Sequence, residues 1–394
     1  MGFSLGTTAL SMFFFEKPVV FTIIQITMII VKPAKYKLSD PFRPKDTSKL
    51  SESIIMYFKL FHIFLGIDLG GFRYQNRQVK YAVRLISLIQ PLAIYGLCIY
   101  ALLKIIANTE FLWYTISFTE YVAMSVAITL FSNEMTYCNF MINLKFIDTK
   151  LKIGDESFRI GVKLISSTIL IGVTRCFTTT TYCLLGFCAK PTAAQILFQI
   201  PWLTIDLMLL QYMFIFYACY CRLVKILRIL KKRNTDIEEM RRIYKTLVDV
   251  LDRARAPFDL AYLLGLLFSI PDVLYSIYES IIKVGEINTA KALSMSIIYI
   301  TNIQSLALMF APALTAGFLP SLTMKMRIIL HDKLLEEQDK KTYRHIVLFI
   351  KYIETCPLKL KACQIIPLDF SFPIIILNIV VTYLIVAIQL THFL

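Results

Sequence analysis

An amide side chain stands near the end of the last apolar run of the sequence, residues 369–394. A run of this length is able to cross a bilayer, because a helical span takes about 20 apolar residues. The amide belongs to Gln389, and an amide in hydrocarbon is costly unless it meets water or a hydrogen-bonding partner. One helical stripe of the run holds Thr382, Val386, Gln389 and Phe393, with Leu390 beside it. The stripe therefore predicts either a water-filled pathway or a contact with a neighbouring helix.

The sequence contains no residues arranged for catalysis or for metal binding. It has no phosphate-binding Walker loop and no His-Glu-x-x-His, and its four histidines stand far apart. The nine cysteines form no Cys-x-x-Cys pair, which argues against a zinc site. Cys183 and Cys188 are close enough to be oxidised together, but we expect ordinary free thiols. The chain is therefore not expected to be an enzyme, nor to hold a cofactor or a metal.

The composition is that of a membrane protein with several helical spans. Of the 394 residues, 57% are hydrophobic and 18% are charged. Seven apolar blocks carry most of the hydrophobic residues: 82–106, 111–131, 160–188, 194–221, 258–283, 292–317 and 370–394. Backbone amides in lipid must be bonded internally, so we expect an all-α fold with seven transmembrane helices.

The positive charges predict the orientation of these spans. The 42 Lys and Arg residues gather in four places, with 11 before residue 82, five in 132–163, 11 in 222–256 and nine in 318–369. Cytoplasmic loops carry such an excess, so the N-terminus is expected inside and the C-terminus outside. The net charge of +15 then indicates loops that face the anionic inner leaflet of the membrane, rather than a surface that binds nucleic acid.

The predicted organisation has four parts. We expect a cytoplasmic N-terminal region (1–81), six spans (82–317), a cytoplasmic helix (318–369) and a last span (370–394). Within the first part, residues 9–31 are expected at the membrane surface, with an extra span as the weaker alternative, and 53–69 as a helix beneath the membrane. The connections 222–256 and 319–363 repeat apolar residues at helical spacing, which predicts extensions that form either a lid within one subunit or an assembly interface.

Two opposite charges lie near the middle of neighbouring spans. Arg175 falls within 160–188 and Asp206 within 194–221. An unpaired charge there costs at least about 2.5 kcal/mol, and pairing relieves much of that cost. We expect a structural ion pair, the alternative being that Asp206 faces a ligand cavity.

Aromatic and amide side chains gather in the outer halves of several spans. Small-molecule sites need apolar walls with a few polar groups, but aromatic residues at span ends also form ordinary interface belts. Trp113 and Tyr114 fit the belt better. The candidate ligand-binding residues are Tyr121, Tyr182, Phe198, Gln199, Trp202, Tyr299 and Asn302.

The last span also carries a family resemblance. Thr382-Tyr383, five hydrophobic residues, Gln389 and a bulky apolar residue resemble the signature of insect gustatory receptors, in which that last residue is usually Phe and here is Leu390. The lead-in, 351–363 and Leu368-Asp369-Phe370, resembles the same family's approach to its final helix. The family's sugar-receptor branch carries Glu after the Thr-Tyr pair, whereas this sequence has Leu384.

The resemblance implies a ligand-gated, weakly selective cation channel in the plasma membrane of sensory neurons. It implies a tetramer, either of this chain alone or with related subunits, held by the cytoplasmic extensions around one pore. Apolar rings of Val386 and Leu390 would gate that pore by excluding water, with Gln389 at the same level. It also implies an outward-opening ligand pocket between the spans, for a bitter or other non-sugar tastant.

Two other classes of protein share part of this pattern. A seven-span G-protein-coupled receptor needs the opposite orientation and a cytoplasmic Asp/Glu-Arg-Tyr or Asn-Pro-x-x-Tyr element, which the sequence does not contain. A transporter is expected to show repeated halves or paired Gly/Pro-broken spans, and none stands out.

Overall fold

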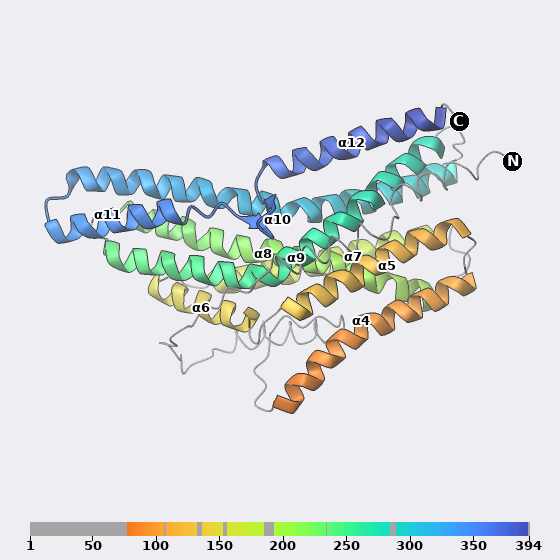
Figure 1. Ribbon diagram of the computed structural model, residues 1–394, viewed down its shortest axis with the longest axis horizontal. Helices are drawn as coiled ribbons and strands as arrows, with labels where there is room; N and C mark the ends of the chain where they lie inside the picture. The colour runs from red at the N-terminus through yellow and green to blue at the C-terminus, as the bar shows by residue number, and fades with distance from the viewer. Residues whose placement is uncertain are drawn as a thin grey trace.

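The computed structural model describes residues 77–105, 108–131, 136–152, 156–184, 193–233, 235–283 and 289–392. Apart from one short hairpin, its regular elements are helices (Figure 1). They are α4 (Arg77–Ile105), α5 (Asn108–Phe131), α6 (Thr136–Lys150), α7 (Glu156–Leu184), α8 (Ala193–Leu230), α9 (Ile237–Lys283), α10 (Thr289–Glu336), α11 (Lys340–Thr355) and α12 (Ser371–His392), with strands β1 (Lys361–Ala362) and β2 (Ile366–Pro367) before α12. The predicted segments at 9–31 and 53–69 lie outside the described residues.

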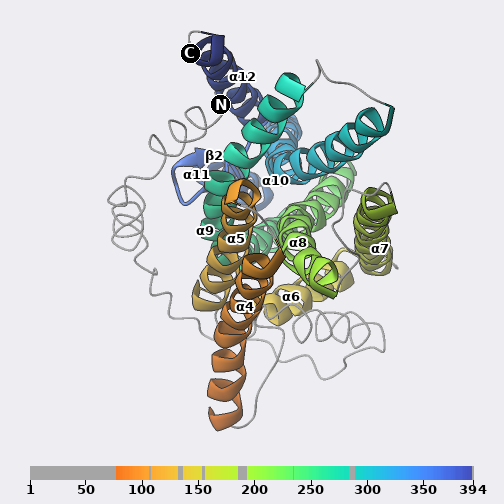
Figure 2. The same ribbon diagram turned by 90° about the vertical axis from the view of Figure 1, so that its right-hand side faces the viewer.

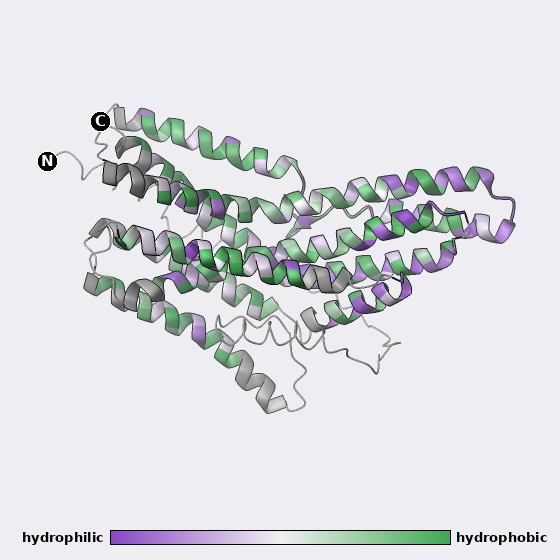
Figure 3. Ribbon diagram, turned by 180° about the vertical axis from the view of Figure 1, so that it is seen from behind, coloured by the Kyte–Doolittle hydropathy of each residue, from purple (hydrophilic) through white to green (hydrophobic). Residues whose placement is uncertain are grey.

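Three long helices run through most of the molecule and join its apolar and charged halves. Helices α8, α9 and α10 contain 38, 47 and 48 residues. Each is longer than a bilayer requires, since about 20 residues suffice. Hydrophilic residues gather over one end of these helices and hydrophobic residues over the rest (Figure 3). The predicted extensions are therefore continuous with the spans, and the charged end of the molecule is built from the same helices as the apolar end.

Six of the seven predicted blocks coincide with helices long and apolar enough to span a membrane. These six lie in α5, α7, α8, α9, α10 and α12. The block at 82–106 falls on α4, in which the residues with described side chains form an apolar stretch at Leu85–Tyr100. The structure thus supports a multi-pass membrane protein of helical fold.

The charged end of the molecule is a packed bundle. Helix α11 lies beside the ends of α8, α9 and α10 (Figure 1) and buries Ile346, Phe349, Ile350 and Ile353 against them. Asp339 caps α11 by accepting hydrogen bonds from the backbone N–H groups of Lys341 and Thr342 and from the Thr342 hydroxyl. The Thr342 bonds lower the pKa of the Asp339 carboxyl, because they favour its ionised form.

Two elements and one covalent bond differ from the sequence-based expectations. Helix α6 fills a connection for which the sequence pattern predicted no helix, and the β1–β2 hairpin interrupts the approach to α12. Cys183, at the end of α7, is disulfide-bonded, so the expectation of a free thiol is wrong for this residue.

Candidate pore helix and ligand-binding region

Helix α12 packs on the rest of the chain along one face only. It lies at one edge of the bundle, on the opposite side from α4 (Figure 2), and contacts α9 and α10. Phe372, Ile376, Val380 and Ala387 form its buried face, each no more than 8% exposed. These residues recur at spacings of four and seven, which is the period of one side of a helix. Most of the other described side chains of α12 are exposed in the single chain.

The exposed surface of α12 carries a polar stripe directly opposite its buried face. Asn378, Thr382 and Gln389 are all exposed. At about 100° per residue, the three lie within an arc of about 40°, and Ile376 and Val380 lie on the far side of the helix. Sequence reasoning found Thr382 and Gln389 but missed Asn378, whose signal is its spacing of four residues from Thr382.

The other predicted residues of this helix are placed as follows. Val386 is 45% exposed and borders the stripe. Leu390 belongs to α12, and its side chain lies outside the described part of the molecule, as does Phe393. The Thr382 hydroxyl donates a hydrogen bond to the carbonyl of Asn378 at 2.8 Å. This bond satisfies the hydroxyl within the helix and leaves the amides as the strongest polar groups of the stripe.

Arg175 and Asp206 are in direct contact inside the bundle. Arg175 Nε donates to Asp206 Oδ2 at 2.7 Å and Nη2 donates to Oδ1 at 3.0 Å, a two-pronged pair. Arg175 is 7% exposed and Asp206 is 2% exposed. Helix α10 completes the group, since Gln304 donates to Asp206 and Ser305 accepts from Arg175. The pair thus joins α7, α8 and α10.

The structure brings four aromatic residues together next to this group. Tyr114, Phe118, Phe198 and Trp202 have ring centroids 5.4 to 6.1 Å apart. Phe118 and Phe198 pack with Cys98 and Leu102 of α4 in a small core separate from the main one. The cluster therefore joins α4, α5 and α8, and it includes Tyr114, which sequence reasoning had favoured as an interface residue.

The other candidate ligand-binding residues are more scattered. Tyr121 is fully buried in the main core, and Gln199 is partly buried. Tyr299 is 38% exposed, whereas the Nδ2 atom of Asn302 is buried and has no hydrogen-bond partner. The side chains of Tyr182 and Trp113 lie outside the described part of the molecule. Asn302 precedes Ser305 by one helical turn on α10, so it lies about one turn from the Arg175–Asp206 pair.

Several buried polar contacts were missed from the sequence. Glu120 of α5 accepts a hydrogen bond from Ser269 of α9 at 2.6 Å, and it is 4% exposed. Towards the charged end, Arg222 pairs with Asp148 of α6 at 2.6 Å, and Arg222 is 2% exposed. The sequence signal for these contacts is a charged residue in or near an apolar block. This signal does not show which residue the charged side chain contacts.

The charged end also exposes large apolar side chains. On α10 these are Met324, Ile328 and Leu335, which are 60%, 52% and 87% exposed. On α11, Tyr343 and Leu348 are 47% and 40% exposed. Groups of exposed apolar residues outside a membrane mark contact surfaces for other chains.

The fold has solved counterparts. No protein-family model matches the sequence, and no curated protein matches it. The structure of the insect olfactory receptor OR5 from Machilis hrabei matches with a TM-score of 0.58 and 13% sequence identity, over 86% of this chain and 99% of that one. The same receptor in complex with eugenol matches with a TM-score of 0.53, at the same identity and coverage. In fold, the chain is therefore similar to an insect olfactory receptor over most of its length.

Proposed function

We propose that this chain is a subunit of a ligand-gated, non-selective cation channel that acts as a taste receptor in the plasma membrane of sensory neurons. Four subunits, identical or related, would surround one pore, each contributing α12. The proposed orientation has the N-terminus inside, the C-terminus outside and seven spans including α4. The similarity in fold to an insect olfactory receptor and the resemblance of the last span to gustatory receptors both support this class of protein.

The polar stripe of α12 is the observation that carries the proposal. Burying an amide in an apolar medium without a partner costs roughly 2–7 kcal/mol. Asn378 and Gln389 would both face hydrocarbon if α12 met lipid on the side opposite its packed face. A water-filled axis formed by several copies of α12 removes this cost.

Assembly of several copies is supported by the charged end of the molecule. The exposed apolar residues of α10 and α11 lie outside the proposed spans, where contact with water is unfavourable. Packing these surfaces against neighbouring subunits would bury them and hold the α12 helices around a common axis.

The ligand is proposed to bind outward from the Arg175–Asp206 pair. Trp202 is one turn outward from Asp206 on α8, and Asn302 is one turn outward from Ser305 on α10. These residues offer an aromatic wall and a hydrogen-bond donor without a partner. They suit a small, largely apolar molecule with a carbonyl or hydroxyl acceptor, in agreement with a non-sugar, bitter tastant.

Gating would follow from a difference between the ligand's affinities for the open and the closed state of the pore. Rings of Val386 and Leu390 would close the pore by excluding water, and Gln389 would contact ions when the rings separate. A ligand opens such a pore only as far as it binds the open state more tightly than the closed state.

Asn302→Leu is expected to raise the half-maximal ligand concentration about tenfold for an agonist with a hydrogen-bond acceptor. The substitution keeps the size of the side chain and removes a hydrogen bond worth about 1–1.5 kcal/mol. Concentration–response curves measure the shift. Thr301→Val is the matched control, because the Thr301 hydroxyl already donates to Ile297 of its own helix. Equal curves for wild type and Asn302→Leu would contradict a role for this amide in binding.

The function itself is tested by whole-cell recording from cells that express this chain alone, with and without a related subunit, against a panel of tastants and odorants. Ligand-evoked cation currents with discrete unitary steps are expected. Saturable uptake without unitary currents would identify a transporter instead. Epitope labelling of each terminus in intact cells checks the orientation, and an external N-terminus would contradict it.

A further inference from the structure

We propose that the hairpin between α11 and α12 positions the pore helix, and that Asp259 is the positioning residue that ties this hairpin to α8 and α9. The inference rests on the channel function proposed above, which it extends with a route from the ligand-binding region to the pore. It follows from the contacts of one carboxylate and from the geometry of the segment 356–370.

Asp259 of α9 makes contacts with three different parts of the chain. Its Oδ1 accepts a hydrogen bond from the hydroxyl of Tyr212, on α8, at 2.5 Å. Its Oδ2 accepts from Nη1 of Arg255, one turn earlier on α9, at 3.1 Å. The backbone of Cys363, in the turn of the hairpin, lies close to this carboxylate. A single side chain thus joins α8, α9 and the hairpin.

Neighbouring polar contacts hold the same segment. Arg255 Nη1 also donates to the carbonyl of Lys361 at 3.0 Å. At the start of the segment, the Tyr244 hydroxyl donates to the carbonyl of Cys356 at 2.9 Å. Hydrogen bonds to charged groups are stronger than neutral ones, so the Asp259–Arg255 site is the firmest attachment of the hairpin.

The backbone of the segment is strained at three places. Leu358, Cys363 and Gln364 have φ angles of 52°, 49° and 63°. Residues with a side chain seldom adopt this left-handed region, and each instance costs of order 1 kcal/mol or more. Cys363 and Gln364 belong to the three-residue loop of the hairpin, 363–365, where a positive φ is most easily adopted by Gly or Asn. Such a conformation persists only where surrounding contacts impose it, and Asp259 provides one of them.

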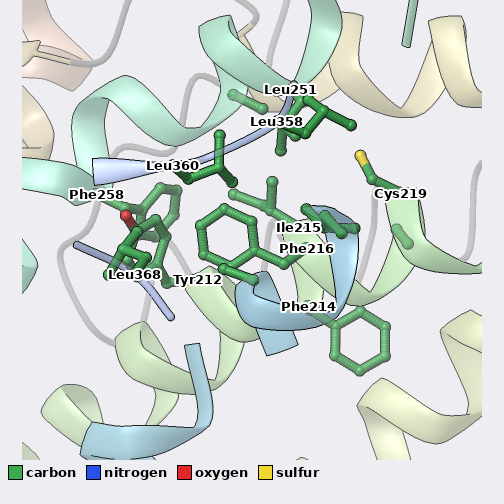
Figure 4. Packing of buried hydrophobic residues seen from close by; sticks show 14 of the residues in the cluster. Tyr212, Phe214, Ile215, Phe216, Cys219, Leu251, Phe258, Leu358, Leu360 and Leu368 are labelled. Atoms are coloured by element: carbon green, nitrogen blue, oxygen red, sulfur yellow. The ribbon is translucent and has the colours of Figure 1, made fainter. Parts of the chain in front are cut away.

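Apolar packing embeds the segment in the main core. Leu360 and Leu368 lie near Tyr212, Phe216 and Phe258 of α8 and α9, and Leu358 lies beside Leu251 of α9 (Figure 4). Leu368 is 1% exposed and Ala362 is fully buried. A shift of α8 relative to α9 would therefore displace the hairpin together with its polar attachments.

The hairpin is joined to α12 by a short and rigid connection. Asp369 Oδ1 accepts hydrogen bonds from the backbone N–H and the hydroxyl of Ser371 and so caps α12. Phe370 packs against Gly317 of α10 so closely that a Cβ atom there would lie 3.2 Å from its ring. No more than three residues separate β2 from α12, so movement of the hairpin must change the position of the pore helix.

Tyr212, which contacts Asp259, also belongs to the helix that carries part of the ligand-binding region, α8. It lies six residues, or about 9 Å, inward from Asp206 on the same helix. Apolar side chains that include Met124, Met208 and Phe258 lie around it. In α9, Pro257 weakens the helix two residues before Asp259, because it supplies no backbone N–H.

Recording from Tyr212→Phe, Asp259→Asn and the double variant tests this route. Each single variant is expected to raise the half-maximal ligand concentration about fivefold and to lower the maximal open probability, with unitary conductance unchanged. The double variant is expected to shift no further than the larger single effect, since both remove one chain of contacts. A purely structural role would lower the number of channels and leave the half-maximal concentration where it is, and that result would overturn the proposal.

Tyr262→Phe is the matched control. Tyr262 belongs to the same aromatic cluster, with its ring 5.3 Å from that of Tyr212, but its hydroxyl donates to the carbonyl of Met309 on α10. Its removal is expected to leave the concentration–response curve within about twofold of wild type. Equal shifts in Tyr262→Phe and Tyr212→Phe would show a general effect of core hydroxyls and would overturn the assignment to the hairpin.

Hydrogen exchange on the purified full-length protein separates this inference from the channel function. Asp259→Asn is expected to speed the exchange of amides in the hairpin and in the first turns of α12, and Tyr262→Phe is not. Unchanged hydrogen exchange in Asp259→Asn would overturn the role of Asp259 in holding the hairpin, even if the wild type passes current. Faster exchange in Asp259→Asn, together with a wild type that passes no current, would support that role of Asp259 and contradict the proposed channel function.

Discussion

Arg175→Ala is expected to remove most of the folded protein from the cell surface. The substitution leaves the carboxylate of Asp206, 2% exposed, with Gln304 and no cation beside it. Removing one partner of a buried ion pair costs about 3–5 kcal/mol, a large part of the total stability of a typical protein. Surface labelling and the melting temperature of the solubilised protein measure the loss.

The double variant Arg175→Ala/Asp206→Ala is expected to reach the surface better than either single variant, because it leaves no uncompensated charge. Surface expression of the double variant no better than that of either single variant would count against the pair as a stabilising unit. Arg327→Ala is the matched control, because the Arg327–Glu354 pair is 43% exposed on both sides. Exposed pairs contribute about 0–1 kcal/mol, so this variant is expected to express nearly as well as wild type.

Gln389→Ala is expected to alter ion permeation as well as basal current. The amide is exposed on the face of α12 opposite its packed face, so the proposed pore presents one amide from each subunit. Each hydrogen-bonding group that contacts a permeating ion or its water is worth about 1 kcal/mol, which corresponds to a change of about fivefold in a permeability ratio. Reversal potentials in mixed cation solutions measure this change, and Leu390→Ala is expected to raise basal current by widening the apolar ring.

Leu377→Ala provides the control on the same helix. Leu377 is 45% exposed and lies about 100° away from Asn378 around the helix, on a side that would meet lipid. Its truncation is expected to leave permeability ratios unchanged. Wild-type currents from correctly expressed Gln389→Ala and Leu390→Ala channels would count heavily against the pore assignment.

The sequence predicted the features that depend on long apolar runs and on residue spacing. Six predicted blocks coincide with helices of spanning length, because hydrophobic length is a property of the chain itself. The stripe of Thr382 and Gln389 was visible for the same reason, since helical periodicity alone places residues on one face. Asn378 belongs to that stripe by the same spacing and was nevertheless missed.

Contacts between distant segments could not be predicted in this way. The Tyr212–Asp259 contact and the hairpin that both residues support depend on how three helices pack, and nothing in the spacing of either residue names its partner. Glu120 and Ser269 are 149 positions apart. Helix α6 was missed because its segment is short and mixed in character, with Lys, Asp and Asn among its apolar residues.

A cysteine scan of α12 tests most directly whether this helix lines a water-filled axis. Single cysteines would replace Asn378, Thr382 and Gln389 on the stripe, and Ile376, Val380 and Ala387 on the packed face. A charged, water-soluble thiol reagent is added during recording, with the wild type measuring the response of the native cysteines. A pore lined by the stripe predicts that the first three variants are modified and lose current, while the last three are not. Modification confined to the packed face, or absent from the stripe, would contradict it.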